Sequence, residues 1–185
     1  MTDSEMNPEK ELQPQPRHES CSAPLPYPKP VIESKNFEWA RLLLEDYAGE
    51  TSEFTAIGQY IFSEFVLDET YFEIAQMFKG IAISEMKHLD LLAGVIIQLG
   101  VYPKFRTLNR QNNIKRNWTP EYIKYEKNAG SALLEAIRSE KRAIEQYRRH
   151  IELISNAQIR ELLNRIIIDE ELHMEMLTRF YSLLT

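Results

Sequence analysis

Cysteine is almost absent from this sequence, because Cys21 is the only one among its 185 residues. A single cysteine cannot form an intrachain disulfide and cannot build an iron or zinc site of four cysteines. Any redox partner for a metal site must therefore come from another molecule. Cys21 itself falls in a segment that looks unstructured, so we expect it to have no role.

Long apolar runs and clusters of positive charge are missing as well. No segment approaches the roughly 18 apolar residues of a transmembrane helix, and the first residues lack the basic-then-apolar order of a signal peptide. The formal net charge of −6, without a Lys/Arg-rich block, argues against nucleic-acid binding. We expect a cytoplasmic protein with no membrane and no nucleic-acid partner, and a hydrophobic content of 43% suits one domain with a core.

Proline is scarce outside the N-terminus, since seven of the nine prolines lie in residues 1–33. Such a composition cannot form a packed helix or bury a core. The sequence therefore predicts an extended or disordered tail over 1–33 and a folded domain over 34–185. The tail either wraps over a neighbouring subunit or forms a disordered leader.

The most informative feature that is present is an internal duplication. The pattern Ser-Glu-x-x-Ala-Ile-x-Gln-Tyr begins at Ser52 and again at Ser139. Each copy is followed by Glu-x-x-His, which begins at Glu85 in the first half and at Glu170 in the second. The offset between copies is 87 residues at the first glutamate and 85 at the second, so the halves differ by two residues in a loop.

Apolar residues at three- and four-residue steps predict helices on both sides of a long connection. The first pair of helices is expected over 36–66 and from an N-cap at Asp68 to a stop at Gly100. The second pair is expected over 131–154 and 157–183. Residues 101–129 break the pattern and predict a long crossover between helices 2 and 3 of a four-helix bundle, with a short helix starting near Pro120.

The duplicated motifs have the spacing of metal ligands. Residues three apart in an α-helix lie about 60° apart on one face, so Glu85 and His88 can bind one cation together. Two helices that give Glu and two that give Glu-x-x-His form the inward-facing set of a dinuclear carboxylate site. The predicted metal ligands are Glu53, Glu85, His88, Glu140, Glu170 and His173. The competing interpretation is a duplicated helical hairpin whose carboxylates are solvated.

Two tyrosines share a helix face with the first glutamate of each motif. Tyr60 and Tyr147 lie two turns after Glu53 and Glu140. They either donate a hydrogen bond to a ligand carboxylate from the opposite helix or are ordinary core residues. Asp169, directly before Glu170, is a further candidate for holding a ligand.

These motifs resemble the ferritin-like superfamily, and most closely bacterioferritin and rubrerythrin, over about residues 37–183. The resemblance implies an all-α, ferritin-like four-helix bundle. It also implies that Glu85 and Glu170 bridge two metals and that Glu53, Glu140, His88 and His173 are terminal ligands. Ala143 stands where rubrerythrins have an extra glutamate, and one cysteine cannot supply a rubredoxin-type domain. Both departures argue against a rubrerythrin-type electron relay.

The resemblance implies a di-iron redox protein that reacts with oxygen or hydrogen peroxide as a peroxidase or ferroxidase, with an external electron donor and as a homodimer. The alternatives are a manganese catalase-like enzyme with two manganese ions and a non-catalytic iron-binding or storage protein. Oxygen and imidazole ligands suit both iron and manganese. Haem is not expected, although Met86 coincides with the haem-ligating methionine of bacterioferritin, because a methionine at a helix interface is the ordinary case.

The substitution Glu85→Ala tests the metal-site prediction. It removes a carboxylate that the resemblance assigns to both metals, so we expect dinuclear binding to be abolished. Metal content per chain, measured on the purified variant and the unchanged protein, checks this. An unchanged metal content would show that the predicted site is wrong.

Overall fold

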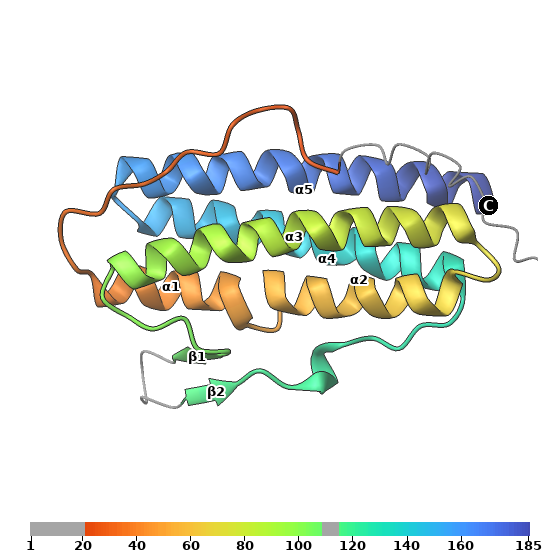
Figure 1. Ribbon diagram of the computed structural model, residues 1–185, viewed down its shortest axis with the longest axis horizontal. Coiled ribbons are helices and arrows are strands. Elements are labelled where there is room, and N and C mark those ends of the chain that lie inside the picture. The colour runs from red at the N-terminus through yellow and green to blue at the C-terminus, as the bar shows by residue number, and fades with distance from the viewer. Residues whose placement is uncertain (1–20, 109–114) are drawn as a thin grey trace, which may run out of the picture.

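The computed structural model describes residues 21–108 and 115–185. Within these residues, five α-helices form four rows along the longest axis, because α1 (Phe37–Ala48) and α2 (Glu53–Leu67) lie end to end (Figure 1). The other rows are α3 (Phe72–Gln98), α4 (Ala129–Leu153) and α5 (Ala157–Leu184). The predicted four-helix bundle is confirmed. Among the described residues, no helix is long and apolar enough to cross a membrane.

The prediction of one continuous helix over 36–66 is wrong, because the helix is interrupted between Ala48 and Glu53. Gly49 leaves the helix in an extended conformation, and the Ser52 side chain caps α2 by accepting from the Thr55 backbone N–H. The hydroxyls of Ser52 and Thr55 both donate to the Gly49 carbonyl at 2.8 Å. A glycine followed by a good N-cap residue is a known stop-and-start signal, and it was present in the sequence.

Asp68 is also not the N-cap that was predicted for the next helix. It is the C-cap of α2, and its backbone N–H donates to the Glu64 carbonyl. The chain then makes a further turn before α3 begins at Phe72. The predicted stop after α3 is correct, since Gly100 has a φ of 91°, a left-handed conformation that favours glycine.

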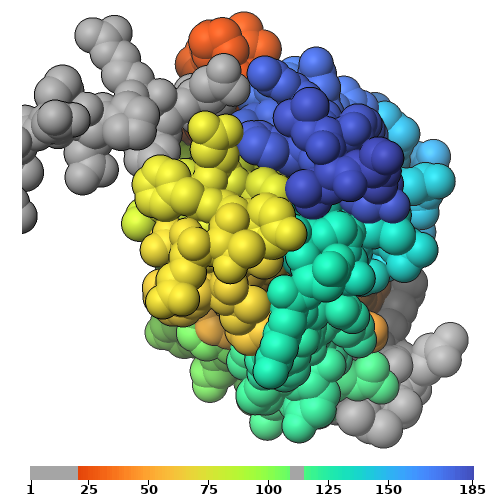
Figure 2. Space-filling view, turned by 90° about the vertical axis from the view of Figure 1, so that its right-hand side faces the viewer, coloured from red at the N-terminus to blue at the C-terminus, as the bar shows by residue number. Residues whose placement is uncertain are grey.

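The crossover from α3 to α4 packs along the row formed by α1 and α2. It contains a short antiparallel hairpin of β1 (Arg106–Leu108) and β2 (Lys115–Asn117), which the sequence did not predict, and a 3₁₀ helix at Pro120–Tyr122. Phe105 stacks on Phe54 with ring centroids 4.2 Å apart, so this connection is attached to the bundle through aromatic contacts. Figure 2 shows the end of the bundle where the start of α4 meets the end of α5.

Two apolar clusters occupy the two ends of the bundle, and a polar layer lies between them. One cluster includes Leu43, Leu92 and Leu163, and the other includes Phe78 and Leu133. The apolar residues at three- and four-residue steps on α3 and α5 face this core, and Ile81, Leu92, Leu163 and Ile166 are buried. The predicted metal ligands fall in the polar layer, so the core itself positions them.

Residues 21–33 run in an extended conformation across the bundle and along α5 (Figure 1). Cys21 is buried with 7% of its surface exposed, so the expectation that it lies in unstructured chain is wrong. Its sulfur lies against Gly80, where an added Cβ would be only 2.6 Å from Sγ. The rest of the predicted tail, residues 1–20, lies outside the described residues.

A buried ion pair joins α1 to α4 beside the helix break. His150 Nδ1 lies 2.8 Å from Asp46 Oδ2, and His150 Nε2 lies 3.5 Å from Glu45 Oε2. Burial lowers the pKa of His150, but the two carboxylates outweigh it and raise the pKa to about 9. His150 is therefore a cation at neutral pH and links the two helices electrostatically.

The variant His150→Gln tests this link. Because the pKa of His150 is raised above its ordinary value of 6.5, the pair stabilises fully below that pH and progressively less as pH rises to about 9. One pKa unit corresponds to about 1.4 kcal/mol. We expect the stability advantage of the unchanged protein over the variant to shrink between pH 6.5 and 9. Denaturant unfolding of both proteins across this range measures it, and a pH-independent difference would contradict the assignment.

Candidate metal centre

The bundle brings all six predicted ligands into one buried layer. Glu53 lies at the start of α2, Glu140 in the middle of α4, and the Glu-x-x-His pairs lie on α3 and α5. Every one of the six side chains is at least 96% buried. Their ligand atoms form two groups, and within each group all the atoms lie within 4.8 Å of one another. One group is Glu53, Glu85, His88 and Glu170, and the other is Glu85, Glu140, Glu170 and His173. Glu85 and Glu170 belong to both groups, as residues between two neighbouring ions would.

The carboxylates in this layer repel one another. Burial, together with the charges of Glu85 and Glu170, raises the pKa of Glu53 and of Glu140 well above the ordinary value. Burial lowers the pKa of His88 and His173, but the surrounding carboxylates reverse this and raise it. Buried carboxylates need positive partners, which bound cations or protons can supply.

An unpaired oxygen also fits a metal ligand. Among the described residues, Glu85 Oε1 is buried without a hydrogen-bond partner, although it lies 3.3 Å from His173 Nδ1. A buried carboxylate oxygen without a donor is costly. The donor set of four carboxylates and two imidazoles therefore fits a pair of divalent cations such as iron or manganese.

Tyr60 and Tyr147 hold the two carboxylates that belong to only one group each. The Tyr60 hydroxyl donates to Glu140 and the Tyr147 hydroxyl donates to Glu53, in each case across the bundle. Burial and the nearby carboxylates raise the pKa of both tyrosines, so both remain protonated donors. The structure thus has the contact that the sequence left as one of two alternatives.

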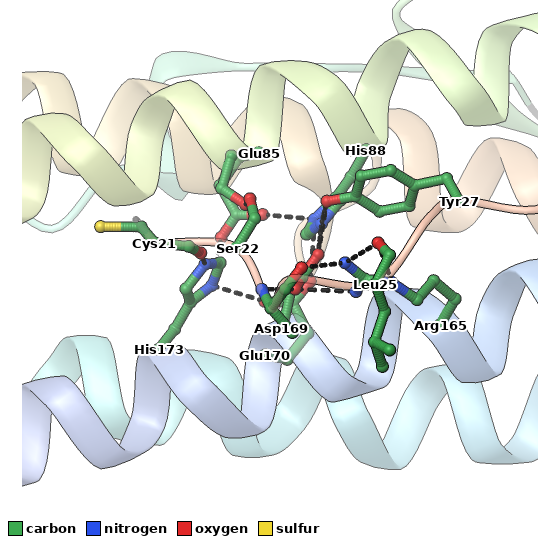
Figure 3. A network of polar contacts seen from close by, with 12 residues as sticks. Cys21, Ser22, Leu25, Tyr27, Glu85, His88, Arg165, Asp169, Glu170 and His173 are labelled. Carbon is green, nitrogen blue, oxygen red and sulfur yellow. Dashed lines mark hydrogen bonds and ion pairs between the residues drawn. The ribbon is translucent and has the colours of Figure 1, made fainter. Parts of the chain in front are cut away.

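The outer nitrogens of the two histidines contact different groups (Figure 3). His88 Nε2 lies 3.0 Å from Asp169 Oδ2, whereas His173 Nε2 lies 2.7 Å from the Cys21 carbonyl oxygen. Tyr27 also donates to Asp169 Oδ2 at 2.5 Å. Asp169 was a sequence candidate, but Cys21 and Tyr27 were not. Nothing in their local sequence signals a contact with residues more than 140 positions away.

A small cavity of about 10 Å³ adjoins the carboxylates on the side of α2 and α4, room for about one water molecule. Its lining includes Glu53, Glu140 and Thr51, which lies in the break between α1 and α2. Gln146 closes this side by donating to Asp46 Oδ1 at 2.8 Å and to the Thr51 carbonyl at 2.9 Å. The helix break thus borders the centre itself.

The family model for rubrerythrin matches residues 48–181, which include all six ligand candidates. The chain belongs to the rubrerythrin family. This places it in the ferritin-like superfamily of dinuclear carboxylate proteins, in agreement with the resemblance seen in its motifs. No curated protein matches this rubrerythrin-family chain in sequence.

Solved structures of two kinds have the same fold as this rubrerythrin-family protein. KatB, a manganese catalase from Anabaena, is 26% identical with a TM-score of 0.74, over 83% of this chain and 75% of the catalase. The bacterioferritin BfrA of Mycobacterium tuberculosis is 23% identical with a TM-score of 0.66, over 82% of this chain and 88% of its own. The bacterioferritin of Desulfovibrio desulfuricans, at 21% identity and a TM-score of 0.65, covers 78% of each chain. The two bacterioferritins show the fold alone.

The variant Tyr147→Phe tests the role of the cross-bundle hydrogen bonds. It removes the donor to Glu53, and loss of a group that orients a metal ligand typically lowers metal affinity by about 10- to 100-fold. Tyr47→Phe is the matched control, because Tyr47 is also buried but stacks on Phe105. Calorimetric titration of the metal-free proteins with Mn²⁺ measures the affinity. Equal losses in both variants would contradict a specific role for Tyr147.

Proposed function

We propose that this protein is an oxidoreductase that reacts with hydrogen peroxide or oxygen at a dinuclear metal centre. The observation that carries the proposal is the pair of four-residue ligand groups that share Glu85 and Glu170. In this proposal those two glutamates would hold both metals. Glu53 and His88 would complete one metal position, and Glu140 and His173 would complete the other.

Charge balance supports two divalent cations in this layer. Four ionised carboxylates and two neutral imidazoles carry four negative charges, which two divalent ions neutralise. When bound, two adjacent iron or manganese ions supply a redox pair that shares a two-electron change. Iron is the leading proposal, on the family membership and the motifs, and manganese is the alternative.

The protein's own groups select a very small substrate. The cavity beside Glu53 and Glu140 has room for about one water-sized molecule, which favours a substrate as small as oxygen or hydrogen peroxide over an organic one. Tyr60 and Tyr147 keep the carboxylates in place with their hydroxyl protons. The apolar clusters on both sides keep the layer free of bulk water.

A manganese catalase-like activity is the second candidate. It is supported by the 26% identity to KatB over 83% of the chain. Disproportionation of two peroxide molecules to water and oxygen balances without an external electron donor. This suits a sequence whose single cysteine cannot form a further iron site of four thiolates. Peroxidase or ferroxidase chemistry requires an external donor or ferrous iron as reductant, and storage predicts many iron atoms per chain.

We further propose a homodimer in the cytoplasm. Support for self-association comes from apolar side chains that are exposed along one side of α3, where Ile83, Met86 and Ile97 are 59%, 45% and 56% exposed. Burial of such residues against a second copy would be favourable.

The decisive experiment combines metal analysis with a peroxide assay. We expect about two metal ions per chain in protein purified without added metal, and rapid peroxide consumption that Glu85→Ala abolishes. After anaerobic loading with ferrous iron, oxidation by peroxide without oxygen release supports the peroxidase or ferroxidase. Two manganese ions with oxygen evolution support the catalase.

Two results would contradict the proposal. The first is a metal-free protein that binds neither Fe²⁺ nor Mn²⁺, and the second is a loaded protein that is inert to both oxygen and peroxide. Many iron atoms per chain would instead support storage.

A further inference from the structure

The two halves of the duplication differ at the position directly before each Glu-x-x-His motif. The residue before Glu170 is Asp169, and the equivalent residue before Glu85 is Ser84. The two Glu-x-x-His motifs otherwise occupy corresponding places on α3 and α5. One half therefore has a carboxylate where the other has a hydroxyl.

Asp169 uses its carboxylate on the histidine of the opposite helix. Its Oδ2 lies 3.0 Å from His88 Nε2, and the aspartate is fully buried. Its Oδ1 accepts from the Ala23 backbone N–H at 2.7 Å and lies 2.8 Å from Arg165 Nη1. These contacts hold the carboxylate in one orientation behind His88.

Ser84 has a hydroxyl and cannot contact His173 through a carboxylate as Asp169 contacts His88. Its hydroxyl is 2.8 Å from the Ser22 hydroxyl, and His173 Nε2 lies instead 2.7 Å from the Cys21 carbonyl oxygen. The extended segment Cys21–Tyr27 thus crosses the place where a second aspartate would act (Figure 3). Arg165 holds this segment by donating to the Ala23 and Leu25 carbonyls at 2.8 and 2.9 Å.

Both histidines direct Nδ1 towards the ligand carboxylates and Nε2 towards these outer groups. His88 Nδ1 lies 2.8 Å from Glu85 Oε2, and His173 Nδ1 lies 3.0 Å from Glu170 Oε2. An imidazole whose outer N–H is donated to a carboxylate is a more basic metal ligand than one bonded to a neutral carbonyl. The outer partners therefore favour the His88 position.

We propose that the two metal positions are inequivalent, with the His88 position binding tightly and the His173 position, completed by the Cys21 carbonyl, binding more weakly. This rests on the proposed dinuclear site and deepens it. The asymmetry comes from Ser84, and the N-terminal segment supplies in part what that residue lacks. Loss of an outer partner typically changes metal affinity by about 10- to 100-fold, so two distinguishable binding steps follow.

Stepwise titration of the full-length metal-free protein with Mn²⁺, followed by calorimetry, tests the inequivalence. We expect two steps whose affinities differ by about 10- to 100-fold. Glu140→Gln and Glu53→Gln form a matched pair, because they are equivalent positions of the repeat. Glu140→Gln should weaken the second step and spare the first, and Glu53→Gln should weaken the first.

The substitution Ser84→Asp tests the cause. It places a carboxylate at the position equivalent to Asp169, so we expect the second step to tighten towards the first. Ser84→Asn is the matched control, since it has the same shape without the charge and should leave the two steps apart. Thermal unfolding of each metal-free variant checks that the bundle is intact, and the two glutamate variants test the proposal independently of whether Ser84→Asp folds.

The outcomes separate the two levels of the hypothesis. Two equal steps in the unchanged protein would overturn the inequivalence. A tight step that survives Glu53→Gln but not Glu140→Gln would overturn the assignment of the tight position to His88. Either result would leave the dinuclear site standing. An equal effect of Ser84→Asp and Ser84→Asn would overturn the assigned cause. No binding of Mn²⁺ or Fe²⁺ by the unchanged protein would overturn the proposed function itself.

Discussion

Six ionisable side chains buried in one layer of an apolar bundle are the constraint on which the rest of this structure depends. Four carboxylates within a few ångströms of one another repel, and burial leaves no water to screen them. The pKa values of Glu53 and Glu140 rise for this reason, and the same carboxylates raise the pKa values of the two histidines against the effect of burial. Such a layer persists only because cations or protons occupy it and the apolar clusters on either side hold its walls together.

The duplicated halves build this layer almost symmetrically and then depart from symmetry around it. Tyr60 and Tyr147 make equivalent cross-bundle contacts. The repeated glutamines also make equivalent contacts with connecting segments. Gln59 donates a hydrogen bond to the Lys124 carbonyl in the crossover, and Gln146 donates one to the Thr51 carbonyl in the helix break. The break between α1 and α2 has no counterpart in α4, which is continuous. Asp169 in the second half is replaced by Ser84 in the first. Asymmetry of the surroundings can therefore distinguish two positions whose direct ligands are alike.

Local patterns predicted much of the fold because helix faces repeat with a fixed period. The stripes on α3 and α5 and the long crossover followed from that period. The interruption at Gly49–Ser52 was missed because the apolar spacing continues across it, although the glycine and the N-cap serine were readable. The hairpin of β1 and β2 was missed because three-residue strands carry almost no periodic signal.

The sequence by itself determined the four-helix bundle and the six ligand candidates, since Glu and Glu-x-x-His repeat at fixed spacing within the apolar faces of the helices. Only the tertiary structure decided what lies behind those ligands. The Cys21 carbonyl contacts His173, Tyr27 donates to Asp169, and Arg165 donates to the Ala23 carbonyl, in each case between residues more than 140 positions apart. Two of these contacts also use a backbone carbonyl, which every residue possesses. Neither kind of contact produces a recognisable sequence motif, because both depend on where an extended segment packs against the folded helices.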